Sequence, residues 1–161
     1  MPPRSGQAHE LTTVDGLAQL SFLIYQLLER RAAAHDLSIV QTRLLGVLRD
    51  RRPTMNELGR LLSLDKSSVS GLVDRAERRG LVERSPSPQD GRAVLVSLTD
   101  QGRAIVADVA PRFGEDVAEL LAPLSASDGR ALSRIVSRAL VAHAEEQGID
   151  LFPAVPVDRR R

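Results

Sequence analysis

The fold is decided by residues 54–98, TMNELGRLLSLDKSSVSGLVDRAERRGLVERSPSPQDGRAVLVSL. This stretch predicts a short helix, a tight turn, a second helix, and then two strands joined by a polar loop. That order of elements is typical of a winged helix-turn-helix, a module that reads DNA. Long segments with helical patterning lie on both sides of it. We therefore expect a mainly α protein with one small β-hairpin, the wing.

Both helices of the module carry start signals in the sequence. Thr54 and Glu57 form a Thr-x-x-Glu capping box at the start of the first helix. Asp65 is a good N-cap for the second helix, which should span residues 66–79 and stop at Gly80. The apolar residues of this second helix recur at helical spacing and predict one buried stripe of Val69, Leu72, Val73 and Ala76.

The side of the second helix opposite the apolar stripe is small and hydroxylated. Short polar side chains let a helix lie deep in a major groove and bond base edges or phosphates. A serine-rich surface helix without a partner is the alternative interpretation, and the position of this helix within the module favours DNA contact. The predicted contact residues on this helix are Lys66, Ser67, Ser68, Ser70, Arg75 and Arg78.

The wing is predicted from two strands, residues 81–84 and 93–98, joined by a loop with two prolines, a glycine and an aspartate. Arg92 stands at the end of the tip, two residues after Asp90. An arginine in this position suits a narrow minor groove, where the negative potential is strongest. A nearby carboxylate can orient the guanidinium. The alternative is an ordinary surface ion pair that contributes little.

Five motifs in unbroken order resemble the MarR family of bacterial transcription regulators. They are LGRLL at 58–62, KSSVSGLVDR at 66–75, RGLVER at 79–84, Asp90-x-Arg92, and LT-x-x-G at 98–102. The resemblance implies a homodimer that binds a pseudo-palindromic operator in double-stranded DNA, usually as a repressor. It also implies release by a small effector, often aromatic or phenolic. By position, Ser67, Ser68 and Ser70 match the recognition helix, Arg75 the helix arginine, and Asp90 and Arg92 the wing pair.

The composition is that of a globular protein of one compact domain, with 161 residues, 42% hydrophobic and 27% charged. No apolar run approaches membrane-spanning length and no signal peptide is visible, so we expect a cytoplasmic protein without a membrane partner. The sequence has no cysteine, which excludes disulfides, thiolate metal sites and peroxide sensing through a thiol. The net charge of +1 permits nucleic-acid binding without deciding it.

The flanking segments predict the dimerisation region. Residues 11–34 carry a broad apolar stripe, and helices should also start at the caps Ser38, Thr99 and Ser125. So much apolar surface exceeds what the small winged module can cover, and a second chain is the natural partner. We expect residues 1–36 and 99–161 to form the dimerisation region and residues 37–98 to form the winged helix-turn-helix.

Other chemistry has weaker signals. Phe22 and Tyr25 are candidate effector-binding residues, although both also fit a core or a dimer interface. His143 and Glu146 alone are too few for a metal site. No recognisable catalytic frame or glycine-rich phosphate loop is present, so neither an enzyme nor a cofactor is predicted. A hydrolase and a helical protein-interaction dimer that does not bind DNA are the competing interpretations. The apolar, proline-containing stretch 149–157 fits either a docked or a frayed tail.

Overall fold

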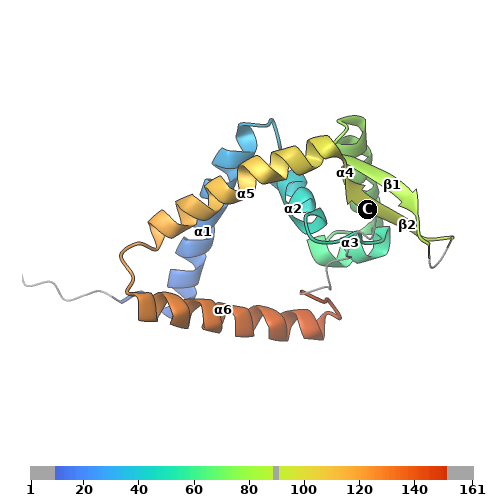
Figure 1. Ribbon diagram of the computed structural model, residues 1–161. Coiled ribbons are helices and arrows are strands. Elements are labelled where there is room, and N and C mark those ends of the chain that lie inside the picture. Colours follow the sequence, from blue (N-terminus) through green and yellow to red (C-terminus); the bar gives the residue numbers. More distant parts are fainter. Residues whose placement is uncertain (1–9, 89–90, 152–161) are drawn as a thin grey trace, which may run out of the picture.

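The computed structural model describes residues 10–88 and 91–151. The predicted mainly α architecture with a single antiparallel hairpin is confirmed for this part of the chain, and the fold is that of a winged helix (Figure 1). In chain order the elements are α1 (Thr13–Ala33), α2 (Ile39–Leu48), α3 (Met55–Leu62), α4 (Lys66–Arg78), β1 (Val82–Pro86), β2 (Val94–Leu98), α5 (Asp100–Leu120) and α6 (Ala126–Glu146).

The helix starts predicted from capping residues are confirmed. Ser38 and Thr54 both form complete capping boxes at the starts of α2 and α3. The Thr54 amide donates to Glu57 Oε2 at 2.7 Å, and this bond lowers the pKa of the Glu57 carboxyl. The hydroxyls of Thr99 and Ser125 accept from the third residue of α5 and α6 in the same way. Local hydrogen bonds of this kind satisfy amides that have no partner inside the helix.

The core lies inside the winged module and is aliphatic, as the near-absence of aromatic residues predicts. Ala32 at the end of α1 completes it, and Ile105 and Val106 of α5 pack against it. This packing holds α4 and the wing against the same hydrophobic core. The largest fully buried side chains are Leu44, Leu58, Leu62, Leu72, Leu81, Val69, Val73, Val82 and Val96.

The wing is longer than predicted at its first strand. β1 continues to Pro86, which pairs with Val94, and the Ser87 amide donates to the Ala93 carbonyl at 2.8 Å. Part of the segment that the sequence predicts as loop, Ser85 and Pro86, therefore belongs to the first strand because it pairs with the second strand. At its other edge β2 is tied to the start of α3, because the Val96 amide donates to the Pro53 carbonyl at 3.0 Å.

A glycine sets the direction in which α5 leaves the module. A β-carbon at Gly102 would lie 2.1 Å from the Leu81 carbonyl oxygen, so no side chain fits there. The same carbonyl accepts from the Thr99 amide at 3.1 Å. Just before it, Gly80 ends α4 with a φ of +68°, as predicted for a left-handed stop. The first turn of α5 is therefore pressed against the start of β1.

Beyond the module the long helices form an open frame. α5 lies beside α1, while α6 crosses below them and returns toward α3 (Figure 1). Arg31 of α1 holds Asp116 of α5 through two bonds of 2.6 and 2.7 Å, which lower the pKa of the Asp116 carboxyl. α6 has no such extensive contact with another described helix or strand. None of the helices in the described ranges combines the length and apolarity needed to cross a membrane.

Candidate nucleic-acid interface

The interface is built on the turn between α3 and α4. Ser63 ends α3 in the left-handed region at φ +55°, and the Leu64 amide donates to the Gly59 carbonyl at 2.9 Å. Leu64, the apolar residue of the turn, is partly buried against the core. The turn thereby fixes the angle between α3 and α4.

Asp65 organises the first turn of α4. Its carboxylate accepts from the Ser68 amide at 2.9 Å, and from the hydroxyls of Ser67 and Ser68 at 2.6 Å each. These bonds, above all those from the two hydroxyls, hold the pKa of Asp65 well below its usual range. Both hydroxyl hydrogens are directed to the carboxylate, so each serine oxygen turns its lone pairs elsewhere.

The predicted outer face of α4 is exposed, and the predicted apolar stripe is buried. Ser70 alone among the predicted contact residues of this helix is half-buried. The Arg75 guanidinium lies over Gly71, where an added β-carbon would be 3.2 Å from Nη1. The exposed members of the predicted set are Lys66, Ser67, Ser68, Arg75 and Arg78.

An ion-pair cluster joins the wing to α4. Arg84 of β1 donates to Asp74 Oδ1 at 2.6 Å and also pairs with Glu77. The two acids lie one turn apart on α4, so a single guanidinium bridges them. The i, i+3 spacing of the acids was visible, but their partner in the next element was not.

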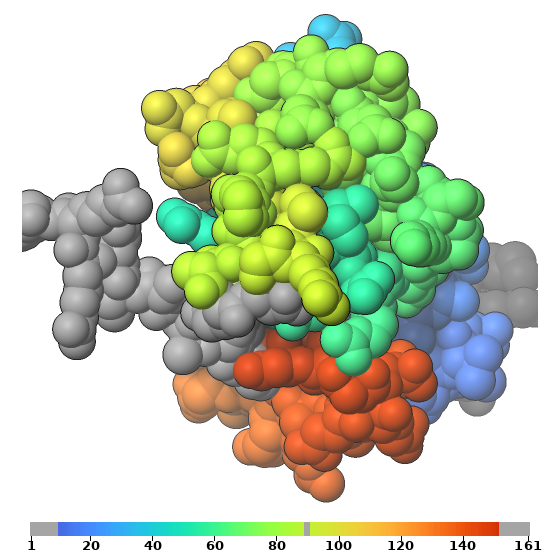
Figure 2. All heavy atoms as spheres, turned by 90° about the vertical axis from the view of Figure 1, so that its right-hand side faces the viewer, coloured from blue at the N-terminus to red at the C-terminus, as the bar shows by residue number. Residues whose placement is uncertain are grey.

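The tip of the wing carries the other predicted contact. Arg92 is exposed beside the exposed Gly91. Asp90, its predicted partner, lies outside the described residues. On the face shown in Figure 2 the wing lies in the middle, with α3 and α4 beside it and the end of α6 beneath. The wing and the outer side of α4 therefore belong to one continuous surface.

A separate apolar cavity of about 220 Å³ lies between α1, α2 and α5. Leu28, Val109 and Phe113 form part of its apolar wall, and Arg43 and Arg49 also line it. The Arg49 guanidinium pairs with Asp50 at 2.7 Å. Phe22 and Tyr25, the candidate effector residues, do not line this cavity. Both residues lie exposed on α1, with relative exposures of 61% and 48%.

Comparisons with known proteins agree with the winged-helix fold described above. Residues 35–93 match the family model described as MarR family. The transcriptional repressor NicR of Pseudomonas putida is 34% identical over 84 residues, which cover 52% of this chain and 53% of NicR. The chain thus spans about half the length of such curated relatives.

Two solved structures match over most of their length. Wild-type MarR from Escherichia coli, in its apo form, has a TM-score of 0.67 and 28% identity, covering 81% of this chain and 98% of that one. The regulator PcaV from Streptomyces coelicolor, solved with its natural ligand, has a TM-score of 0.62 and 27% identity, covering 82% and 94%. The motifs, the winged fold and these matches agree: residues 35–93 match the MarR family model, and the chain is similar to MarR-family transcription regulators over most of its length.

Proposed function

We propose that the chain acts in the cytoplasm as a transcription repressor that binds double-stranded DNA as a homodimer and leaves it when a small molecule binds. One observation carries the DNA-binding part. Lys66, Ser67 and Ser68 are exposed at the N-terminal end of α4, while the opposite side of the helix is buried in the core. In helix-turn-helix proteins the N-terminal residues of this helix contact base edges in the major groove.

The remaining predicted contacts divide between phosphates and the minor groove. Arg75 and Arg78 lie exposed on later turns of α4, and we assign them to the sugar-phosphate backbone. We assign Arg92 to the minor groove beside the half-site, with Asp90 as its predicted orienting partner. In this scheme residues 37–98 are the DNA-binding unit, and residues 1–36 and 99–161 form the dimerisation region.

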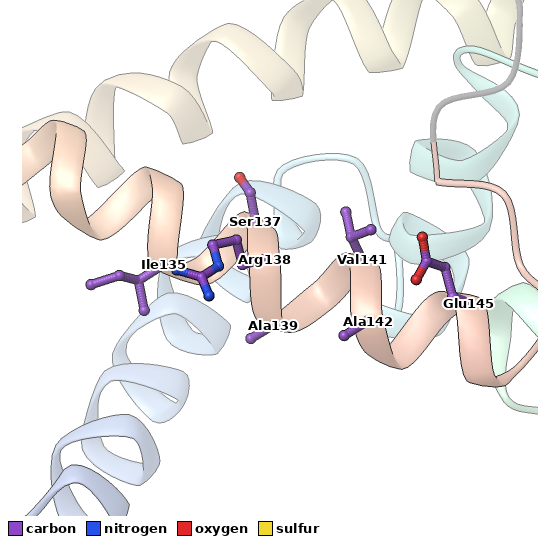
Figure 3. Close-up of a pocket in the computed structure, with 7 residues that line it drawn as sticks. All are labelled: Ile135, Ser137, Arg138, Ala139, Val141, Ala142 and Glu145. Atoms are coloured by element: carbon purple, nitrogen blue, oxygen red, sulfur yellow. The ribbon is translucent and has the colours of Figure 1, made fainter.

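The homodimer is proposed from uncovered apolar surface. Val14 and Leu17 of α1 are 76% and 58% exposed, and Ile135 and Leu140 of α6 are 60% and 55% exposed. Along α6, Ala139 and Ala142 project from one side and Ser137 and Val141 from the other (Figure 3). Apolar side chains left in water on two long helices favour association, and a two-fold dimer would place two copies of α4 on a pseudo-palindrome.

The effector site is proposed in the cavity between α1, α2 and α5. Its volume of about 220 Å³ suits a compound of a single ring, below the size of most drug-binding pockets. The apolar wall favours an aromatic or phenolic ligand, and Arg43 is the lining arginine that could pair with an acid group, because Arg49 already pairs with Asp50. Because the cavity touches both α1 and α2, an occupant can change how the DNA-binding unit sits on the long helices. Phe22 and Tyr25 remain candidates for a second effector contact on α1.

The test is DNA binding measured by fluorescence anisotropy. The labelled duplex carries the region upstream of the protein's own gene, and a scrambled duplex of equal length and composition is the control. We expect the upstream duplex to bind at least tenfold more tightly, and light scattering to give a dimer. Equal and weak binding of both duplexes by a well-folded dimer would favour the alternative, a protein-interaction module without DNA.

Arg92→Ala tests the wing in the same assay. If each wing arginine neutralises one phosphate, the slope of log K against log salt flattens by about 2 in a dimer. Affinity falls on both duplexes, because the contribution of Arg92 is largely electrostatic. Arg92→Lys is the matched control and should keep most of the slope. An unchanged slope for Arg92→Ala would remove the wing from the contact surface.

A further inference from the structure

α1 ends in a turn that leaves two backbone carbonyls for other elements to bind. Asp36 adopts the left-handed region at φ +53°, and its amide donates to the Ala33 carbonyl at 3.1 Å. The Leu37 amide donates to the Ala32 carbonyl, also at 3.1 Å. This is the bonding pattern of a Schellman stop. The carbonyls of His35 and Asp36 lie beyond the last turn of the helix, so α1 itself supplies no donor for them.

A single arginine at the end of α4 supplies these donors. Arg79 is the C-cap residue of α4. Its Nη1 donates to the Asp36 carbonyl at 2.7 Å, and its Nη2 donates to the His35 carbonyl at 3.0 Å. Nη1 also reaches the side-chain oxygen of Gln41 at 3.4 Å, and Gln41 belongs to the capping box that starts α2. One guanidinium thus joins the end of the proposed recognition helix to the turn between α1 and α2.

The same turn forms part of the wall of the cavity between α1, α2 and α5. Leu37 lines this cavity and is only 7% exposed. The Asp36 carbonyl and the Leu37 amide belong to one planar peptide unit, so a displacement of Leu37 also moves a carbonyl that Arg79 binds. The turn is also tied to α5, because His35 Nε2 lies 2.9 Å from Asp108 Oδ2. A short series of bonds therefore connects the cavity wall to α4.

We propose that Arg79 is a positioning residue that sets the orientation of α4 and, through the α1–α2 turn, passes occupancy of the cavity to it. This role rests on the proposed function and gives the route by which a bound effector weakens DNA binding. Arg79 is not a DNA contact in this scheme, because its guanidinium is bound to carbonyls. It also lies at the far end of α4 from Lys66, and the 13 residues of this helix span about 20 Å.

A change in the orientation of α4 should act unequally on different DNA contacts. Contacts with base edges need fixed geometry, whereas contacts with phosphates depend mainly on charge. A loss of orientation should therefore weaken binding to the upstream duplex much more than binding to the scrambled one. It should leave the slope of log K against log salt unchanged, because no phosphate contact is lost.

The first experiment measures anisotropy with Arg79→Met in the full chain, which keeps the aliphatic stem and removes every donor. We expect about a tenfold loss of affinity on the upstream duplex, about twofold or less on the scrambled duplex, and no change of slope. The matched control is Arg52→Met, which removes the same charge from an exposed position of the winged module. It should cost about twofold or less on both duplexes.

A conservative variant separates positioning from folding. Arg79→Lys keeps the charge and can still donate to a carbonyl, so it should recover part of the affinity for the upstream duplex. Melting followed by circular dichroism gives the folded fraction of each variant. If Arg79→Met does not fold, Arg79→Lys carries the test, since its smaller loss must again fall on the upstream duplex alone.

The second experiment tests the connection to the cavity. Gly46 of α2 also lines it, and a β-carbon added there would have no described atom from the rest of the fold within 4 Å. Gly46→Leu adds an apolar group at the cavity wall, and Gly46→Ala is the matched control. Gly46→Leu should weaken binding to the upstream duplex severalfold more than Gly46→Ala. In the Arg79→Met background this difference should shrink, and a double-mutant cycle measures the coupling.

The outcomes separate this proposal from the proposed function. Failure of the wild-type protein to bind either duplex overturns both. If the wild type binds and Arg79→Met behaves like Arg52→Met on both duplexes, the positioning role alone is overturned. Losses on both duplexes with a flattened slope also overturn it, since they make Arg79 a phosphate contact. A difference between Gly46→Leu and Gly46→Ala that is absent, or is equal in both backgrounds, overturns the connection to the cavity.

Discussion

Among the described residues, the carboxyl of Asp65 has the most strongly shifted pKa. Three donors from two serines converge on its carboxylate and depress its pKa. The unfolded-state pKa is about 3.9, so the stabilisation is complete above that pH and is lost as the pH falls toward the lower folded-state value. Between pH 6 and pH 2.5 the wild type should therefore lose stability more steeply than Asp65→Asn, which keeps a capping oxygen but does not titrate. Urea unfolding followed by circular dichroism measures this, and a difference that stays constant with pH would contradict it.

The same bonds determine what Ser67 can recognise. Because its hydrogen is directed to Asp65, its oxygen is left as an acceptor. A protein oxygen that accepts in the major groove can bond the amino groups of adenine or cytosine. Ser67→Ala should cost about 1–3 kcal/mol on the upstream duplex and much less on the scrambled one, with the salt slope unchanged. An equal loss on both duplexes would assign Ser67 to phosphate contact instead.

Among the elements, one ion-pair bridge joins the wing to α4 in addition to the core packing. Arg84 pairs with Asp74 and Glu77 and so neutralises two carboxylates on α4, the proposed recognition helix. Arg84→Gln should lower affinity on both duplexes, because two acids are then left uncompensated near phosphates. Adding Asp74→Asn and Glu77→Gln should restore affinity if repulsion is the cause. A loss that persists in the triple variant would show that the bridge acts by positioning the wing. Thermal stability should change little, since partly exposed ion pairs contribute about 0–1 kcal/mol.

For the whole molecule, the exposed apolar side of α6 supports the proposed homodimer. Leu140 is 55% exposed, and burial against a second chain would remove apolar surface from water. Leu140→Lys should shift the dimer toward monomer by at least tenfold in dissociation constant, measured by analytical ultracentrifugation. Glu145→Lys places the same group toward the other side of the helix and is the control. The expectation is wrong if both variants remain dimers at nanomolar concentration.

The sequence alone determined the elements of this protein. The capping side chains of Thr54, Asp65 and Thr99 accept from an amide three residues ahead. Apolar residues repeat every three or four positions along one helix face, and Gly80 ends its helix within one turn. These interactions form between neighbours in the chain, so their residue types and spacing are sufficient to predict them. The order of elements with these motifs was then enough to predict the winged helix and the family.

Only the tertiary structure decided which distant residues meet. Arg84 reaches Asp74 across two elements, and Arg51 holds Leu151 from 100 positions away. Pro86 joins a strand because Val94 lies opposite it, although its own propensity favours a loop. The sequence also did not predict that the hydroxyls of Ser67 and Ser68 both donate to Asp65. Such contacts depend on side-chain direction and on the path of the whole backbone, which no local pattern encodes.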